Sequence, residues 1–238
     1  MAIEKSFLLA RHYLFRGVDP ATMSRVGEMA VTKRLDRGER LFQKGDEGDA
    51  LFGVLEGQVR ISAPSLSGKE MILNLMEEGD IFGEIALLDG GDRTADATAM
   101  TRCELLMLRR RDFMQFLERE PKLAIHLLKL LCERVRWTSN LIEDAAFLPL
   151  PNRLAKRLLA IADIHGDERD DGSVRITSKI SQSELGQMMG TARETVNRHL
   201  QAWRRQGWVD MEKNHIVILD RDALEAQVEA IEDGGQDW

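Results

Sequence analysis

The spacing of hydrophobic residues changes twice along the chain. From about residue 31 to residue 110, short apolar runs alternate with turns that contain glycine. Several short strands at close spacing, separated by turn signals, indicate a small β-barrel or sandwich. The strand candidates are residues 51–55, 59–62, 71–75 and 105–108. Before them, residues 1 to about 30 have a helical pattern in which Asp19 and Pro20 begin a turn.

From Pro121 to about residue 146, the hydrophobic residues repeat with the spacing of a helix. Its apolar positions are separated alternately by four and by three residues, which is the a/d spacing of a coiled coil. These positions are Ala124, Leu128, Leu131, Val135, Thr138, Ile142 and Ala145. The alternative is an ordinary amphipathic helix, for which Leu123, Leu127 and Leu130 provide an adjacent face. Two apolar faces favour a helix that packs both on its own domain and on a second copy of itself.

Two prolines, Pro149 and Pro151, interrupt the helical pattern. Proline ends helices and stiffens linkers, so residues 147–152 are expected to form a hinge. Asn152 is expected to cap the next helix, from residue 153 to about residue 164.

Two short amphipathic helices follow, joined by a tight turn. Ser181 and Glu184 have the spacing of a capping box at the start of the first helix. Gly190 suits the left-handed residue that ends this helix, and Thr191 is expected to cap the second, residues 192 to about 205. The inward-facing residues are Leu185, Met188, Met189, Val196, Leu200 and Trp203. The pattern is that of a helix-turn-helix.

The second of these helices has polar side chains on its outer face, near its N-terminus. They are Arg193, Glu194, Asn197 and Arg198. This part of a helix-turn-helix enters the major groove of DNA, where arginine reads guanine and glutamate accepts from the amino group of cytosine. The alternative is a solvated, salt-bridged helix face, and the capped helix pair favours DNA. Residues 206–219 are expected to form a two-stranded wing with a turn near residues 213–214.

A short segment combines the groups that a cyclic nucleotide needs. Residues 79–84 read Gly-Asp-Ile-Phe-Gly-Glu, and Arg93 and Thr94 follow nine residues later. Gly83 permits close approach of the backbone to a ligand, Arg93 offers a planar fork of donors to a phosphate, and Thr94 adds a hydroxyl. Glu84 would repel a phosphate but accept from a sugar hydroxyl. The alternative is a glycine-rich turn with a solvated charge pair, and the ordered combination favours the nucleotide.

The charge, hydropathy and cysteine content of the chain limit the functions that it can have. The net charge of −7 argues against nucleic acid, but residues 147–215 carry 11 Lys and Arg against 9 Asp and Glu, while residues 216–238 carry 1 against 7. An acidic tail therefore hides a mildly basic segment. The sequence contains no run of about 18 apolar residues, so no membrane span is predicted. The N-terminal residues lack a signal-peptide pattern. Cys103 and Cys132 have no disulfide or metal-site spacing, so a cytoplasmic protein without a metal is expected.

Two other classes of protein are disfavoured. The sequence has no constellation of nucleophile and base, so enzyme activity is not expected. A haem or redox sensor would need an axial ligand set or a thiol cluster, and the histidines are scattered. They are His12, His126, His165, His199 and His215.

The chain resembles the CRP/FNR superfamily of bacterial transcription regulators over nearly its whole length, most closely the cyclic-AMP receptor branch. The matching stretches are residues 68–73 (GKEMIL), 79–84 (GDIFGE), 183–187 (SELGQ) and 193–196 (RETV). The nucleotide-binding residues that the resemblance implies are Gly83, Glu84, Ile85, Arg93, Thr94, Arg134, Thr138 and Ser139. Gly83 and Glu84 would bind the cyclic phosphate and the ribose 2′-hydroxyl, Arg93 and Thr94 the phosphate, and Thr138 and Ser139 the base. Arg134 would pair with Glu84. The implied DNA-binding residues are Ser181, Gln182, Thr191, Arg193, Glu194, Thr195, Asn197 and Arg198.

The resemblance implies an α+β fold in five parts. The parts are a cyclic-nucleotide-binding β-roll, or jelly-roll-like barrel (1–120), a dimerisation helix (121–146), a hinge (147–152), a winged helix-turn-helix (153–219) and an acidic C-terminal tail (220–238). The expected function is that of a cytoplasmic, homodimeric transcription regulator with no membrane association. Cyclic AMP, acting as an allosteric ligand, would promote binding to a palindromic TGTGA-like site in double-stranded DNA. RNA polymerase would be a further partner.

Departures from the family pattern leave alternatives open. Thr94 stands where the cyclic-AMP receptor branch has serine and resembles cyclic-GMP-binding domains, so cyclic GMP, alone or with cyclic AMP, is the main alternative ligand. Pro149 replaces an aspartate at the hinge, and Asn197 replaces a glycine in the second helix. A ligand-independent regulator with the same DNA-binding dimer is a further alternative, and a haem or redox sensor of the same superfamily is less favoured.

Overall fold

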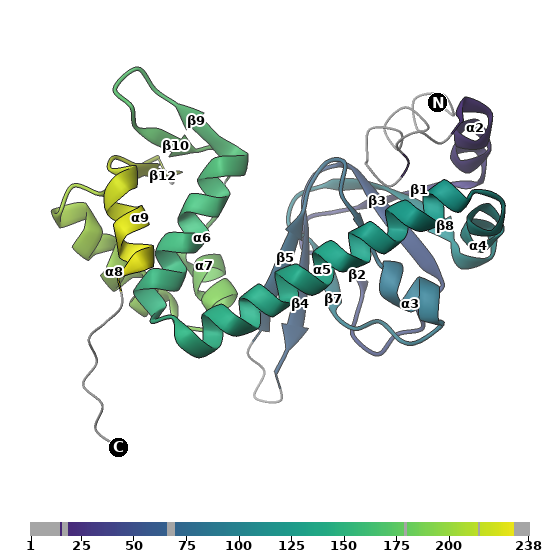
Figure 1. Cartoon of the computed structure of the whole chain (residues 1–238), viewed down its shortest axis with the longest axis horizontal. Helices are drawn as coiled ribbons and strands as arrows, with labels where there is room; N and C mark the ends of the chain where they lie inside the picture. The colour runs from purple at the N-terminus through teal and green to yellow at the C-terminus, as the bar shows by residue number, and fades with distance from the viewer. Residues whose placement is uncertain (1–14, 16–18, 66–69, 179, 214, 231–238) are drawn as a thin grey trace. The chain divides into compact units, whose positions relative to one another are not determined.

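The computed structural model describes residues 15, 19–65, 70–178, 180–213 and 215–230 of the chain. The chain divides into two compact units, residues 1–136 and residues 137–238 (Figure 1). Within the described part of the chain, no helix combines the length and the hydropathy that a membrane span requires.

The first unit contains two antiparallel four-stranded sheets. One has the strand order β1-β8-β3-β6 and the other the order β2-β7-β4-β5. The strands are β1 (Val31–Leu35), β2 (Arg40–Phe42), β3 (Ala50–Glu56), β4 (Val59–Pro64), β5 (Glu70–Met76), β6 (Ile81–Phe82), β7 (Asp96–Ala99) and β8 (Cys103–Arg109). Both sheets join strands that are distant in sequence, as a roll requires. The predicted α+β fold class is confirmed.

The four predicted strands correspond to β3, β4, β5 and β8. The other four were not predicted because their sequences, VTKRL, RLF, IF and DATA, are short or interrupted by polar residues. Pairing with neighbouring strands of the sheet stabilises them instead. Strand β1, for example, pairs with β8 along its whole length, from Val31 opposite Met107 to Leu35 opposite Cys103.

Helices cover part of this unit and share a hydrophobic cluster with its strands. The helices are α2 (Pro20–Met29), α3 (Glu84–Asp89), α4 (Arg110–Arg119) and the first part of α5 (Pro121–Phe147). Val26 of α2, Phe113 of α4 and Leu123 of α5 lie in one buried cluster with Leu106 of β8. Asp19 and Pro20, which were predicted to begin a turn, begin α2, and the Asp19 carboxylate accepts hydrogen bonds from the first amides of the helix. The rest of the helical prediction before residue 19 lies outside the described residues, apart from residue 15.

Helix α5 has the two faces that its sequence predicts. Leu123, Leu127 and Leu130 are buried against the first unit. Three residues of the a/d positions are instead largely exposed: Leu128 by 61%, Val135 by 65% and Ile142 by 66%. A helix with an exposed apolar stripe has a surface suited to a partner helix.

The second unit contains a four-stranded antiparallel sheet with the order β11-β12-β10-β9. Its elements after α5 are α6 (Leu150–His165), β9 (Gly166–Glu168), β10 (Val174–Ile176), α7 (Gln182–Met189), α8 (Arg193–Arg205), β11 (Val209–Glu212), β12 (His215–Ile218) and α9 (Arg221–Glu229). The predicted two-stranded wing is therefore one half of a larger sheet, because β10 pairs with β12 from a distant part of the chain. The turn of this wing was predicted near residues 213–214, and residue 214 lies outside the described residues.

The link between α5 and α6 is shorter than the predicted hinge of residues 147–152. Only Leu148 and Pro149 separate the two helices. Pro151 lies in the first turn of α6, where the missing N–H of proline is not needed. The prediction that Asn152 caps a helix beginning at residue 153 is wrong, because Asn152 lies inside α6 and is buried.

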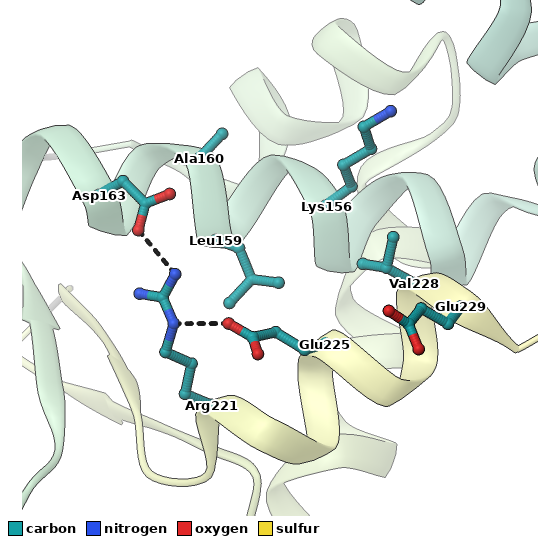
Figure 2. A pocket seen from close by; sticks show the side chains of 8 residues that line it. All are labelled: Lys156, Leu159, Ala160, Asp163, Arg221, Glu225, Val228 and Glu229. Atoms are coloured by element: carbon teal, nitrogen blue, oxygen red, sulfur yellow. Dashed lines mark hydrogen bonds and ion pairs between the residues drawn. The ribbon is translucent and has the colours of Figure 1, made fainter.

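Residues 221–229 were expected in an acidic tail but form helix α9. Asp220 begins this helix by accepting a hydrogen bond from the amide of Ala223 at 2.9 Å, and Leu224 is completely buried. Helix α9 lies beside α6 (Figure 2). A groove of about 370 Å³ between them is lined by Lys156, Leu159, Ala160, Asp163, Arg221, Glu225, Val228 and Glu229. The prediction of a tail was based on charge composition, which does not show that Leu224 is buried. Residues 231–238 lie outside the described residues.

Candidate functional site

Gly83 stands at the turn from β6 into α3 and requires glycine for two reasons. Its φ of 85° lies in the left-handed region. A Cβ atom added there would lie 2.8 Å from Nη1 of Arg93 and 3.2 Å from the carbonyl oxygen of Ala50. The backbone at this turn therefore packs directly against the Arg93 guanidinium.

Arg93 is only 5% exposed and is held inside the first unit. Its Nη1 donates to the carbonyl of Gly83 at 3.1 Å and its Nη2 to the carbonyl of Ala50 at 2.8 Å. Its Nε is buried and has no hydrogen-bond partner among the described residues. Burial lowers the pKa of the Arg93 guanidinium, and the charges of Asp49, Asp46 and Glu84 oppose this shift. The side chain therefore presents a positive charge that is already removed from most of its water.

Aromatic rings support Arg93, and the sequence pattern did not identify them. Its guanidinium carbon lies 4.3 Å from the centre of the Phe42 ring and 5.5 Å from that of Phe52. Phe82, next to Gly83, lies with its ring centre 5.5 Å from that of Phe52. Cation–π contacts of this kind orient a guanidinium. No spacing rule could have found them, because the three rings come from β2, β3 and β6.

Glu84, the first residue of α3, is also 5% exposed. Its Oε1 lies 3.7 Å from Nε of Arg134, so the two residues form an ion pair. Arg134 also donates from Nη2 to the carbonyl of Ile81 at 3.0 Å. The sequence resemblance implied this pairing, and helix α5 supplies the arginine 50 residues after the glutamate. Gly83, Glu84, Arg93 and Arg134 are thus brought together in the first unit.

The remaining nucleotide-binding candidates have more exposed positions. Thr94 is exposed beside Arg93, and Ile85 is exposed on α3. Thr138 and Ser139 are exposed on α5, one helical turn after Arg134, and belong to the second unit. Of these four residues, only Thr94 and Ile85 lie in the same unit as Arg93.

The second unit contains the predicted capping box. The amide of Glu184 donates to Oγ of Ser181 at 3.2 Å, and the amide of Ser181 donates to the Glu184 carboxylate at 2.6 Å. Gly190 ends α7 with a φ of 66°, as predicted. Gly186 was not predicted to be important, yet a Cβ atom there would lie 2.8 Å from the carbonyl oxygen of Thr191. The close turn between α7 and α8 therefore requires two glycines.

The predicted cap of the second helix needs correction. Helix α8 begins at Arg193 with Ala192 as its N-cap residue, and no side chain caps it. Thr191 instead belongs to the turn, where its amide donates to the carbonyl of Gly186 at 2.8 Å. Tight packing of the turn against α7 thus moves the helix start by one residue.

The two faces of α8 are as predicted. Val196, Leu200 and Trp203 are buried. The outer face carries Arg193, Glu194, Asn197 and Arg198, all exposed, with Thr195 partly exposed beside them. Of the other DNA-binding candidates, Ser181 is exposed, and Gln182 and Thr191 are partly exposed, at the two ends of α7.

Comparison with known proteins identifies both units. Residues 32–120 match the cyclic nucleotide-binding domain, and residues 152–227 match the Crp-like helix-turn-helix domain. The chain is 32% identical over 217 residues to the CRP-like cAMP-activated global transcriptional regulator of Mycobacterium tuberculosis, covering 91% of this chain and 96% of that protein. The chain belongs to the CRP/FNR family of transcription regulators.

Two further CRP/FNR relatives extend this comparison. The cyclic AMP receptor protein of Thermus thermophilus is 32% identical over 212 residues, covering 89% of this chain and 94% of that protein. The crystal structure of a CRP/FNR family transcriptional regulator from the same species is 31% identical with a TM-score of 0.65, covering 84% of this chain and 99% of that one. The helix-turn-helix match reaches residue 227 and so includes most of α9.

Proposed function

We propose that this protein is a homodimeric regulator that binds cyclic AMP around Arg93 and, in response, binds a palindromic DNA site through α8. The observation that carries the proposal is Arg93. Its guanidinium is almost completely buried, and the buried Nε has no partner among the described residues. A buried charge is costly unless it is paired, which supports an anionic ligand at this position.

Glu84 supports a ligand that carries a sugar as well as a phosphate. A carboxylate accepts hydrogen bonds only, so it favours a hydroxyl group and disfavours a second phosphate oxygen. Its ion-pair distance of 3.7 Å to Arg134 is longer than a hydrogen bond, which leaves its oxygens able to accept from a hydroxyl. A cyclic nucleotide supplies both groups, and the family resemblance implies that Thr138 and Ser139 contact its base.

Cyclic AMP is favoured over other cyclic nucleotides by the relatives, which are named as cAMP-activated or as cyclic AMP receptors. Cyclic GMP is the second candidate. The observation that favours it is Thr94, a threonine exposed beside Arg93 in the position where the cyclic-AMP receptor branch has serine.

A homodimer is supported by the exposed stripe on α5. Leu128, Val135 and Ile142 repeat at the spacing of a coiled-coil seam, and a second copy of the same helix is the partner that this spacing fits. Dimerisation would give the two α8 helices a two-fold relation. The expected DNA site is then a TGTGA-like palindrome with half-sites about 34 Å apart. RNA polymerase is the expected partner at the promoter.

The test is a calorimetric titration of the full-length protein with cyclic AMP, cyclic GMP and cyclic di-GMP, for the native chain and for Arg93→Ala. A charged hydrogen bond to phosphate is worth about 1.5–3 kcal/mol, so Arg93→Ala should weaken cyclic AMP binding at least about tenfold. Arg34→Ala is the matched control, because Arg34 is an exposed arginine of the same unit. Unchanged affinity of a folded Arg93→Ala protein would rule out the pocket.

The DNA part of the proposal is tested by selection from a random duplex pool with and without cyclic AMP. Enrichment of a palindrome only with cyclic AMP is the expected result. Enrichment in both conditions would favour the ligand-independent regulator, and a non-palindromic site would contradict the dimer. Sedimentation of Val135→Asp should show a monomer, while the native chain sediments as a dimer.

A further inference from the structure

Helix α9 is fastened to α6 at both of its ends. At its start, Arg221 donates to the carboxylate of Asp163, in the last turn of α6, at 2.8 Å. Arg221 also donates to Glu225 one turn further along α9 at 2.7 Å (Figure 2). At its end, α9 meets Asn152, in the first turn of α6. The two helices are therefore antiparallel, and the end of α9 lies beside the beginning of α6.

The contact at Asn152 is buried and uses both parts of its amide. Nδ2 donates to the carbonyl of Ala230 at 2.6 Å and to that of Val228 at 3.4 Å. Oδ1 accepts from Nε2 of Gln227 at 3.2 Å. The last carbonyls of a helix have no partner within the helix, and buried polar groups need one. Asn152, which is 1% exposed, supplies it from another helix.

Asn152 is close to the link between α5 and α6, because it lies three residues after Pro149, the last residue of that link. The same link is also spanned by a hydrogen bond of 2.7 Å from Lys156 of α6 to Asp144 of α5. The amide of Leu148 donates to the carbonyl of Asp144, and the amide of Arg153 to that of Pro149. The first two turns of α6 are thus held by the end of α5, through Lys156, and by the end of α9, through Asn152.

We infer that Asn152 is a positioning residue for the nucleotide response, which anchors α9 on the first turn of α6 and so fixes the α5–α6 link. This inference rests on the proposed function. A ligand shifts an equilibrium only by its different interactions with the two states. The link is the covalent connection from α5 to the DNA-binding helices, so a link that is free to vary in conformation transmits less of that difference. Loss of Asn152 weakens the coupling and leaves the pocket intact.

The test compares Asn152→Asp with Arg221→Gln in the full-length protein. Asn152→Asp keeps the shape of the side chain but replaces the two N–H donors that face the α9 carbonyls. Arg221→Gln loosens α9 at the end away from the link. Gln227→Ala removes one bond to Asn152 and is the milder variant, informative even if Asn152→Asp does not fold. DNA affinity is measured by fluorescence anisotropy on the palindromic duplex, with and without cyclic AMP.

The ratio of the two DNA affinities should fall about fivefold or more in Asn152→Asp. It should fall less in Gln227→Ala, and by no more than about twofold in Arg221→Gln, whose partners are exposed. Cyclic AMP affinity in the absence of DNA should change by less than about twofold in all three proteins, because Gly83, Glu84, Arg93 and Arg134 lie in the other unit. A ratio that is unchanged in Asn152→Asp and Gln227→Ala, or an equal loss of DNA affinity with and without nucleotide, overturns the inference.

Hydrogen exchange separates this inference from the proposed function. In Asn152→Asp or Gln227→Ala, amides 226–230 of α9 and 153–156 of α6 should exchange faster than in the native chain, whereas Arg221→Gln should affect the start of α9. If the native chain shows no nucleotide response, the proposed function fails and the inferred coupling fails with it, while faster exchange still supports the contact. Unchanged exchange at both segments overturns the role of Asn152 whether or not the native chain responds.

Discussion

The proposed nucleotide pocket and the proposed DNA-binding face of α8 both contain arginine, but in opposite environments. Arg93 is buried and held by two backbone carbonyls and by the ring of Phe42. Arg193 and Arg198 are exposed on the outer face of a helix. The first site therefore has a charge whose position is fixed by contacts within the protein. The second has charges exposed to water, which DNA would have to displace on binding.

This difference indicates where single substitutions should act most strongly. A preorganised group loses little conformational freedom when its ligand binds, and a change that moves it affects affinity directly. On an exposed recognition face, the contacts are individually modest and sequence preference arises from several of them together. Changes behind Arg93 should therefore have larger effects than changes on the outer face of α8.

The largest effect is expected from Gly83→Ala, compared with Gly38→Ala. Both glycines have a φ of 85°, but only the new methyl at Gly83 would meet Arg93, while nothing lies within 4 Å at Gly38. Both variants should lose stability by roughly 1–3 kcal/mol from backbone strain. Only Gly83→Ala should also lose cyclic AMP affinity, at least about tenfold, because Arg93 must move. Thermal unfolding and calorimetric titration measure the two quantities; equal affinities would mean that the pocket is not preorganised around Gly83.

Arg193→Ala should have a smaller combined effect, because it changes DNA binding without backbone strain. The loss should be about 1–3 kcal/mol on the cognate site, with relaxed preference at one base pair of each half-site. Arg205→Ala, in the last turn of the same helix, should weaken binding to all sequences alike if it has any effect. Anisotropy titrations on cognate and scrambled duplexes distinguish the two. If Arg193→Ala lowers both affinities equally, then Arg193 contacts the backbone and not a base.

The capping box of α7 should contribute to stability more than to recognition. Ser181→Ala removes the hydrogen bond to the amide of Glu184 and should cost about 0.5–2 kcal/mol in the free energy of unfolding. Ser183→Ala, an exposed serine of the same helix, should change stability much less. Chemical unfolding measures both variants. A large loss of DNA affinity in a Ser181→Ala protein of near-native stability would instead make Ser181 a direct DNA contact.

The smallest effect concerns pH. Burial, and then the charge of Arg198, lower the pKa of His199 below its usual value of 6.5. Because the unfolded chain then binds a proton more readily than the folded one, stability is retained above pH 6.5 and falls as the pH decreases below it. His199→Gln should flatten this slope in unfolding experiments between about pH 7.5 and pH 5.5. A slope identical to that of the native chain would show that another group titrates.

Local patterns in the sequence determined much of both sites. The capping box of Ser181 and Glu184, the left-handed Gly190 and the outer residues of α8 follow from short spacings, because helix geometry relates each residue to neighbours three and four positions away. The two faces of α5 follow for the same reason. The segment with Gly83, Glu84 and Arg93 was recognised because its functional groups lie within 11 residues of one another.

Only the tertiary structure decided what surrounds these groups. Phe42 of β2 and Ala50 of β3 contact Arg93, and Asn152, predicted to be a helix cap, is buried against the end of α9. Residues 221–229 have the composition of a tail but form a helix, in which Leu224 is completely buried and which packs against α6. Burial and long-range hydrogen bonds depend on which distant segments pack against each other. The spacing of residues within one segment does not determine which other segment it packs against.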